Sequence, residues 1–497
     1  MSDTFYITTP IYYVNDKPHI GHAYTTILAD VLARYHRYAG QETFFLTGLD
    51  EHGQKVQQAA EKRGVEAQQH CDEMAPRFTN LWEQLHISHD DFIRTTEERH
   101  KKVVRDILQV VMNKGDIYEA EYEGLYSVSE ERFITEREAE SGEFRDIRKL
   151  KEKNYFFKMS KYQQALIDHI ESNPKFIQPE HRKNEVLGFL RQPLNDLCIS
   201  RPKSRLNWGI ELPFDSDYVT YVWFDALINY ITAPGFGTDE KSFKKWWPAS
   251  YHLIGKDILT THAVYWPTML MSAGLELPKS IFAHGWWLMG ESKMSKSRGN
   301  VINPMDLIED YGVDPVRYYL MREMVLGQDS SFTMESFIQR YNSDLANDFG
   351  NLLSRVSTLM KKNYGGEIPD SGGLTNAETT IKSNGESLGE KVNEKIEAMR
   401  LNEAIEEIMQ YVRSVNKYME DNAPWKLVKE DKIAAGRILY TAGEALRISA
   451  VLLSPVMPNR TAILLNALNA QGTRLAWGGL IPGNELKDHE PLFPRVK

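Results

Sequence analysis

The chain has 497 residues, 42% of them hydrophobic, which is typical of a folded protein with two to four domains and excludes a chain that is disordered throughout. Its 59 basic and 69 acidic residues give a net charge of −10, which argues against a surface that binds nucleic acid everywhere but allows a local basic face. We find no run of about 18 apolar residues and no signal-peptide pattern, so we expect a cytoplasmic protein without a membrane segment.

The first predicted elements alternate between strand and helix. Residues 5–14 are rich in β-branched and aromatic side chains and predict a buried strand. From Gly21, apolar residues recur with the spacing of an amphipathic helix, which Gly40 ends. A second strand at 42–50 ends on Asp50. This order predicts a doubly wound parallel sheet, in which ligands bind at the carboxyl ends of the strands, where Asp50 lies.

The pattern changes in the middle of the chain and then returns. Residues 116–160 contain short alternating runs separated by charged turns, which predict a small β-rich insertion. Strand-like segments at 218–226, 249–257 and 282–290, with a helix at 258–272, restore the α/β pattern. The sequence therefore predicts one nucleotide-binding sheet whose halves are separated by an insertion.

The last third of the chain is predicted to be a helical bundle. Its helical segments are 336–364, 386–421, 431–454 and 459–469. Together these patterns predict five parts: a first half of the nucleotide-binding domain at 1–115, a connective insertion at 116–215, a second half at 216–290, a basic loop with a linking segment at 291–335, and the helical domain at 336–497.

Two histidines, His19 and His22, bracket Gly21 at the expected start of the first helix. A helix N-terminus presents unpaired N–H groups and a positive dipole end, and a glycine allows an anion to approach the backbone. Both imidazoles could then donate hydrogen bonds to phosphate oxygens. Two alternatives remain: two structural histidines in a polar turn, and a metal site, which has no third ligand nearby in the sequence.

A cationic segment, ESKMSKSRGNV at 291–301, follows the last predicted strand of the sheet. It places Lys293, Lys296 and Arg298 in a loop that also contains serine and glycine. Such a loop could neutralise the charge that develops on a departing pyrophosphate. A solvated basic loop without a function would have the same composition.

The two motifs HIGH and KMSKS occur in this chain in the same order and context as in a known family. The chain resembles the class I aminoacyl-tRNA synthetases, in which the pair brackets ATP on a split Rossmann-type parallel sheet. Six further stretches narrow the resemblance to the methionyl-tRNA synthetases of the bacterial type: TPIYYVND, TGLDEHG, NYFFKMSKYQ, YVWFDALINY, IGKDILTTHAVYWP and AHGWWLMGESKMSKS. It implies an α/β catalytic domain with a small β-rich insertion, followed by an all-α anticodon-binding bundle.

The resemblance also implies roles for individual residues. The catalytic residues would be His19, His22, Lys293 and Lys296, and the ATP-binding residues Gly21, Gly255, Asp257 and Lys296. Methionine would contact Ile11, Tyr13, Trp223, Ala226, Tyr230 and His262, with Asp50 on its ammonium group. An aromatic pocket suits a polarizable thioether, and a polar group such as His262 or Tyr13 could distinguish sulfur from methylene.

The implied reaction has two steps. The carboxylate of L-methionine would attack the α-phosphate of ATP, which arrives with Mg²⁺, and the terminal adenosine of tRNA(Met) would then take the amino acid from the adenylate. The resemblance places anticodon contacts at Asn351, Arg355 and Trp425. Pro424 would begin a helix and leave Trp425 near its start, where the indole could stack on a base or anchor the bundle.

One departure from the family pattern concerns zinc. Many relatives bind zinc through cysteine pairs in the insertion, whereas this chain has Ser127 and Glu130 in that segment. The segment ESGEFRDIRKL, which would supply the second pair, contains no cysteine, and the two cysteines of the chain are Cys71 and Cys198. We therefore predict no structural zinc, since a zinc knuckle needs thiolate or imidazole ligands.

Two alternatives to a methionine enzyme stay open at this point. A class I synthetase for another apolar amino acid would share both motifs, but the stretches around Trp223 and His262 favour methionine. A non-catalytic tRNA-binding relative would have no need for the whole set His19, His22, Lys293 and Lys296. We expect a monomer, because no appended domain of the kind that some relatives use to dimerise follows the bundle.

Overall fold

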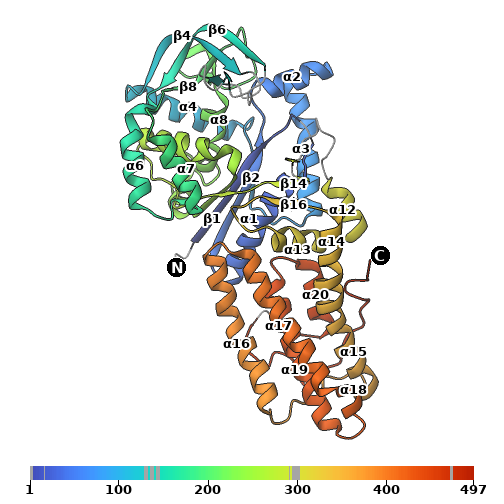
Figure 1. Cartoon of the computed structure of the whole chain (residues 1–497). Helices are drawn as coiled ribbons and strands as arrows, with labels where there is room; N and C mark the ends of the chain where they lie inside the picture. Colours follow the sequence, from blue (N-terminus) through green and yellow to red (C-terminus); the bar gives the residue numbers. More distant parts are fainter. Residues whose placement is uncertain are drawn as a thin grey trace. The chain divides into compact units, whose positions relative to one another are not determined.

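The computed structural model describes residues 4–15, 17–127, 132–134, 139–140, 146–289, 292–293, 303–470 and 474–496. It divides into two compact units, each of which is described by itself (Figure 1). The first consists of Met1–Pro18 and Ala33–His284, and the second of His19–Leu32 and Gly285–Lys497. Helix α1 (Ile20–Tyr38) begins in the second unit and ends in the first.

The first unit is built on a parallel sheet of six strands in the order β3-β2-β1-β12-β13-β7. The strands are β1 (Thr4–Tyr13), β2 (Glu42–Asp50), β3 (Asp91–Arg94), β7 (Ile177–Gln178), β12 (Tyr251–Gly255) and β13 (Ile281–His284). The pairing of β1 with β12 joins the two halves that the insertion separates in the sequence, so the predicted split parallel sheet is confirmed.

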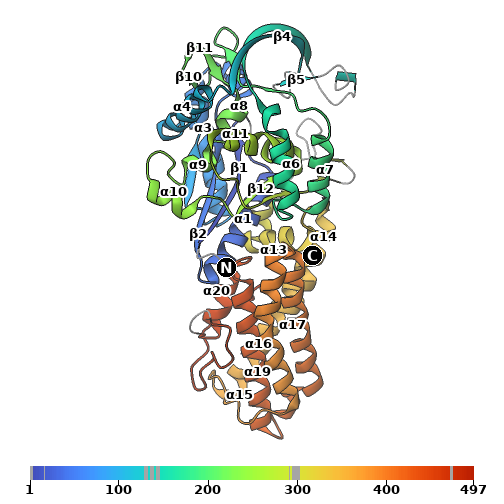
Figure 2. The same ribbon diagram turned by 90° about the vertical axis from the view of Figure 1, so that its left-hand side faces the viewer.

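The first unit also contains α-helices, several of which contribute buried side chains to the same apolar core as the sheet. They are α2 (Gln54–Arg63), α3 (Ala67–Gln84), α4 (Glu98–Asn113), α6 (Gln163–Ser172), α7 (Glu180–Leu190), α8 (Val222–Ala226), α9 (Asn229–Thr232), α10 (Glu240–Trp246) and α11 (Trp266–Ala273). Helices α6 and α7 flank β7 in the sequence and lie beside that edge of the sheet (Figure 2). Strand β7 thus enters the central sheet from within the range predicted as insertion.

Two small antiparallel sheets belong to the insertion. One has the order β5-β4-β6-β8 and the other β10-β11-β9. Their strands are β4 (Ile117–Ser127), β5 (Arg132–Ile134), β6 (Ile147–Phe157), β8 (Leu197–Cys198), β9 (Ser200–Pro202), β10 (Glu211–Leu212) and β11 (Asp215–Thr220). The predicted strand at 218–226 is wrong in its second half, because pairing with β9 ends at Thr220 and α8 begins at Val222. A short apolar run does not distinguish strand from helix.

The second unit contains the helical bundle and a three-stranded sheet, β15-β14-β16. These strands are β14 (Trp287–Met289), β15 (Ser292–Lys293) and β16 (Ser330–Phe332). The helices are α12 (Pro304–Tyr311), α13 (Val313–Glu323), α14 (Met334–Arg340), a π-helix (Tyr341–Gly350), α15 (Asn351–Tyr364), α16 (Asn376–Glu397), α17 (Leu401–Asn422), α18 (Pro424–Leu427), α19 (Lys432–Leu453) and α20 (Pro458–Ala467). The predicted all-α bundle is confirmed.

One predicted helix of the bundle is two helices. The segment 386–421 falls into α16 and α17, which a turn separates at Met399, whose φ is 55°. Apolar periodicity continues across this turn, so the sequence pattern alone does not show the break. Within the described part of the chain, no helix is both long and apolar enough to cross a lipid bilayer.

Candidate functional site

The turn between β1 and α1 holds its two histidines in a defined tautomer. The backbone N–H of Gly21 donates to His19 Nδ1 at 3.0 Å, and the N–H of His19 donates to His22 Nδ1 at 3.1 Å. Because each Nδ1 accepts, each neutral ring carries its hydrogen on Nε2. A Cβ on Gly21 would lie 2.9 Å from His19 Cε1, so this close approach requires glycine. The turn therefore presents two imidazole N–H donors at a helix N-terminus, an arrangement suited to phosphate.

The ends of β1 and β2 bring three of the predicted methionine-binding residues together. Tyr13 pairs with Asp50 and Ile11 with Gly48, so all of them lie at the carboxyl edge of the sheet. Asp50 is buried, and Ile11 packs against the apolar core. A Cβ on Gly48 would lie 2.0 Å from the Ile93 carbonyl, so β2 needs glycine there to pair with β3.

Tyr230 and His262 form a buried hydrogen-bonded pair. His262 Nδ1 lies 2.9 Å from the Ile258 carbonyl, which accepts, so Nδ1 carries the hydrogen and Nε2 accepts from the Tyr230 hydroxyl at 2.8 Å. Burial lowers the pKa of His262 to about 4, although its bond to the Ile258 carbonyl acts in the opposite direction. The imidazole is thus neutral at pH 7. Burial raises the pKa of Tyr230, and Tyr12 and the Asp50 carboxylate raise it further, which places Asp50 near this pair.

Another buried histidine, His252 on β12, was not predicted as part of the site. Its ring lies 4.2 Å from the ring of Tyr230. Its Nε2 accepts from Trp266 Nε1 at 3.2 Å, so its Nδ1 donates to Thr8 Oγ1 at 2.8 Å. Burial, followed by the neighbouring His262, lowers its pKa well below the ordinary value. A lone histidine in an apolar strand just before Gly255 was the only signal in the sequence.

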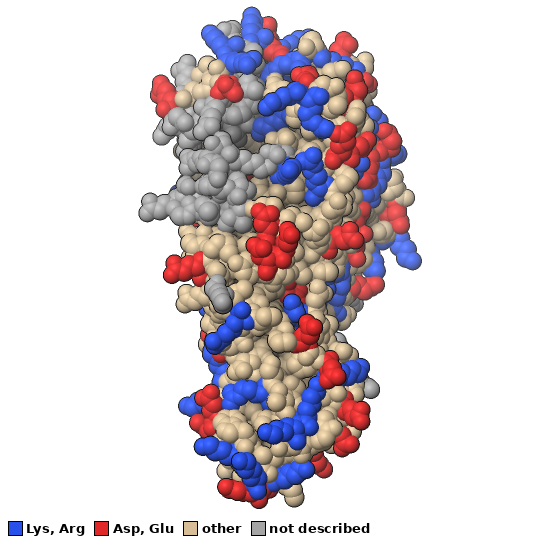
Figure 3. Space-filling model, turned by 90° about the vertical axis from the view of Figure 1, so that its right-hand side faces the viewer, with Lys and Arg blue, Asp and Glu red and all other residues tan. Residues whose placement is uncertain are grey.

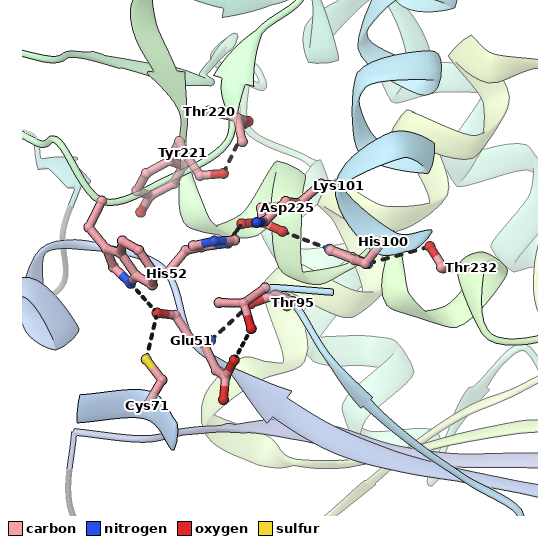
Figure 4. A network of polar contacts seen from close by, with 12 residues as sticks. Glu51, His52, Cys71, Thr95, His100, Lys101, Thr220, Tyr221, Asp225 and Thr232 are labelled. Atoms are coloured by element: carbon pink, nitrogen blue, oxygen red, sulfur yellow. Dashed lines mark hydrogen bonds and ion pairs between the residues drawn. The ribbon is translucent and has the colours of Figure 1, made fainter. Parts of the chain in front are cut away.

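The predicted pocket residues Trp223 and Ala226 lie on α8, on either side of a buried carboxylate. Asp225 accepts from His52 Nδ1 at 2.6 Å and from His100 Nε2 at 2.7 Å (Figure 4). Burial raises the pKa of Asp225, but the two histidines outweigh it and bring the pKa down to about 2. Asp225 is therefore a carboxylate at every physiological pH.

The predicted nucleoside-binding residues follow β12. A Cβ on Gly255 would lie 2.6 Å from Asp257 Oδ1, so glycine leaves room for this carboxylate to fold back over the end of the strand. The second predicted phosphate-binding segment lies mostly outside the described residues. Lys293 belongs to strand β15, whereas Lys296 is not described, so the role of this loop stays a prediction.

Three predicted anticodon residues lie together in the bundle. The Arg355 guanidinium lies 4.9 Å from the centre of the Trp425 ring, and Asn351 is exposed one turn earlier on α15. Ala423 has a φ of 39°, and Pro424 then begins α18 and is buried, which leaves Trp425 only partly covered. Figure 3 shows lysine and arginine side chains, with acidic ones among them, at the end of the bundle that carries α15 and α18.

Family models match almost the whole chain. Residues 5–143 and 144–357 match the class I tRNA synthetases (M), and residues 368–488 match the anticodon-binding domain of methionyl tRNA ligase. The chain belongs to the methionine–tRNA ligases. It is therefore similar to enzymes that are aminoacyl-tRNA ligases and use ATP, which confirms the predicted family and reaction class.

Individual relatives support this assignment. The chain is 46% identical to the methionine–tRNA ligase of Fusobacterium nucleatum over 100% of this chain and 80% of that protein. It is 44% identical to the enzyme of Thermotoga maritima over 99% and 80%. The structure of Mycobacterium tuberculosis methionyl-tRNA synthetase in complex with methionyl-adenylate has a TM-score of 0.95 at 40% identity, with 99% of this chain and 100% of that chain covered.

The described residues contain no candidate metal site. No group of three or more histidine, cysteine, aspartate and glutamate side chains among them could hold an ion. Ser127 ends β4, whereas Glu130 and the segment 141–145 lie outside the described part of the chain. The predicted lack of a structural zinc therefore stays a prediction.

Proposed function

We propose that this ligase activates L-methionine with ATP and transfers it to the 3′ end of tRNA(Met). The observation that carries the proposal is the buried pair Tyr230–His262 with Asp50 nearby. It combines an apolar aromatic surface, one neutral polar group and one carboxylate, which match a thioether side chain and an ammonium group.

The proposed methionine site depends on the charge state of its residues. His262 stays neutral at pH 7, so closing the pocket around a thioether desolvates no imidazolium. Asp50, at the end of β2, supplies the negative charge for the substrate ammonium. Trp223 and Ala226 from α8, Ile11 and Tyr13 from β1, and Tyr230 would cover the methionine side chain.

The proposed phosphate site uses the turn at the start of α1. His19 and His22 would each donate from Nε2 to phosphate oxygens, and Gly21 would admit the phosphate chain to the helix N-terminus. Lys293 and Lys296 would neutralise the departing pyrophosphate. Magnesium would arrive as part of the ATP substrate.

The proposed reaction has two steps, and neither needs a covalent enzyme intermediate. The methionine carboxylate attacks the α-phosphorus of ATP and pyrophosphate leaves, after which a hydroxyl of the terminal adenosine of tRNA takes the methionyl group and AMP leaves. The protein contributes position and charge, which are the main sources of rate in phosphoryl transfer. In the bundle, Trp425, Arg355 and Asn351 would contact the anticodon.

Methionine-dependent exchange of pyrophosphate into ATP tests the proposal. We expect exchange with methionine and little with leucine or cysteine. Exchange that is fastest with leucine or cysteine would contradict the choice of amino acid. The variant Lys296→Ala should lose most exchange but keep its affinity for tRNA, and a variant that keeps both would contradict the role of the KMSKS loop.

Light scattering of the purified protein would test the predicted monomer.

A further inference from the structure

A buried carboxylate joins three segments of the first unit. Asp225 on α8 receives one hydrogen bond from His52, in the loop after β2, and one from His100 on α4. The side chains of His52, Asp225 and His100 are 3%, 1% and 0% exposed. Figure 4 shows the two imidazoles pointing at the carboxylate from opposite sides. The proposed function gives none of the three a contact with the substrate, so their effect on the reaction would pass through their neighbours.

Those neighbours are residues of the proposed methionine site. His52 lies two positions after Asp50, and Asp225 lies between Trp223 and Ala226. The bond from His52 to Asp225 therefore ties the segment that would bind the ammonium group to the segment that would cover the side chain. His100 fixes the other carboxylate oxygen to a long helix, α4.

Both tied segments depend on contacts outside themselves. Helix α8 has five residues, fewer than an isolated helix needs to be stable, and its Phe224 packs in the apolar core. The loop after β2 is held at Glu51, whose N–H donates to Thr95 Oγ1 at 2.9 Å and whose carbonyl accepts from Trp208 Nε1 at 2.5 Å. These two bonds fix the loop to the segment after β3 and to the segment between β9 and β10, but not to α8. The carboxylate with two directional partners supplies that link.

We propose that His52, Asp225 and His100 form a positioning group that fixes the distance between Asp50 and Trp223, and so sets the length of the amino acid that the site accepts. The inference rests on the proposed function, which assigns the roles of Asp50 and Trp223. A buried ion pair is weak evidence for stability alone, whereas its directional bonds specify one arrangement of the segments it joins.

Exchange kinetics of the variant Asp225→Asn test the inference, because the amide has nearly the shape of the carboxylate but can accept from only one histidine. We expect the KM for methionine to rise about tenfold or more, with the KM for ATP within about twofold, since a misplaced pocket wall affects only the amino acid. The preference for methionine over ethionine, which has one more methylene, should fall by about fivefold or more.

A pair of variants at His100 provides a second test that does not depend on the folding of Asp225→Asn. In His100→Gln the amide nitrogen takes the place of Nε2 and keeps the N–H donor, so the KM for methionine should stay within about threefold of wild type. In His100→Met the donor is lost, and the KM should rise as in Asp225→Asn. Equal effects of both variants would overturn the inference.

The matched control is Asp116→Asn. Asp116 is also 1% exposed and is bound by Lys161, Tyr162 and Ser272, but it has no bond to the pocket segments. A merely structural role of Asp225 predicts equal changes in both variants, in melting temperature and in both KM values. If the wild-type protein catalyses exchange and Asp225→Asn has the same KM for methionine, the inference is overturned but the proposed function stands. A wild type without methionine-dependent exchange would overturn the proposed function and the inference with it.

Discussion

The neutral imidazole of His262 makes the stability of the protein depend on pH. Its pKa in the folded protein is about 4, whereas an exposed histidine has a pKa of about 6.5. Between these values the unfolded chain binds a proton that the folded protein does not, so the free energy of unfolding falls as the pH is lowered from about 6.5 towards 4. Above pH 6.5 the histidine is neutral in both states and none of this stability is lost. Below pH 4 the loss is complete, and a pKa shift of this size makes it about 3 kcal/mol.

Denaturant unfolding of wild type and His262→Gln at pH 7.5 and pH 5 checks this. Glutamine does not titrate, so we expect the variant to lose less free energy of unfolding between the two pH values than the wild type. Asp225 is unaffected by His262 and cancels in the comparison, whereas the pKa of His252 rises when the neighbouring imidazole is removed, which reduces the loss in the variant further. Parallel losses in the two proteins would show that His262 is not held neutral by burial.

Gly255 gives a second prediction at the scale of a residue. In Gly255→Ala the new Cβ would lie 2.6 Å from Asp257 Oδ1 and displace that carboxylate. We expect the KM for ATP to rise about tenfold and the KM for methionine to change little, as measured by pyrophosphate exchange. The control is Gly188→Ala on α7, where a Cβ meets nothing within 4 Å. It should leave both KM values unchanged and add up to about 1 kcal/mol to the free energy of unfolding.

Helix α18 of the bundle carries Trp425, whose partly exposed ring could stack on a base of the anticodon. Trp425→Ala removes a stacking partner for a base, an interaction worth about 1–3 kcal/mol, so the KM for tRNA in aminoacylation should rise about 10- to 100-fold. Pyrophosphate exchange, which needs no tRNA, should not change. Ile463→Ala on α20, which removes an exposed apolar side chain, is the control. A loss of exchange or of folding in Trp425→Ala would indicate a core anchor.

Three elements of the second unit meet at one buried ion pair. Arg317 on α13 lies 2.6 Å from Asp30 on α1 and also donates to the carbonyls of Pro455 and Val456, just after α19. Both charged side chains are 0% exposed. This pair fixes the start of α1, which carries the two histidines of the turn, to the unit that contains the bundle.

Breaking this pair should be costly. In Arg317→Met the Asp30 carboxylate keeps its place without its counter-ion, which typically costs about 3–5 kcal/mol of unfolding free energy. Lys102→Met is the control, because the pair of Lys102 with Asp106 is 57% and 48% exposed and is worth no more than about 1 kcal/mol. Urea unfolding of both variants measures the difference. Similar losses would mean that Arg317 contributes no more than a surface charge.

For the molecule as a whole, the net charge of −10 restricts how a polyanion can bind. Binding of tRNA must therefore rely on a local face where lysine and arginine side chains outnumber acidic ones. Each phosphate contact releases counterions, so the KM for tRNA should rise about tenfold or more between 50 and 200 mM KCl. The KM for methionine should change less than twofold. A salt-independent KM for tRNA would exclude a binding mode dominated by phosphate contacts.

The accuracy of the sequence predictions depended on how local each feature is. Strands β1 and β2 and helix α19 were predicted within a few residues, because their periodicity and flanking breaks lie in one stretch of chain. The break at Met399 and the change from β11 to α8 were missed, because apolar spacing continues across the first and is ambiguous in the second.

The sequence by itself determined the family, the alternation of strand and helix at the start of the chain, and the two motifs proposed to bind phosphate, since each lies in a continuous segment. The tertiary structure alone decided which polar groups share a buried carboxylate. Asp225 is 173 residues from His52 and 125 from His100. Pairings over such distances arise only when the sheet and α4 fold together and exclude water, and no local pattern records them.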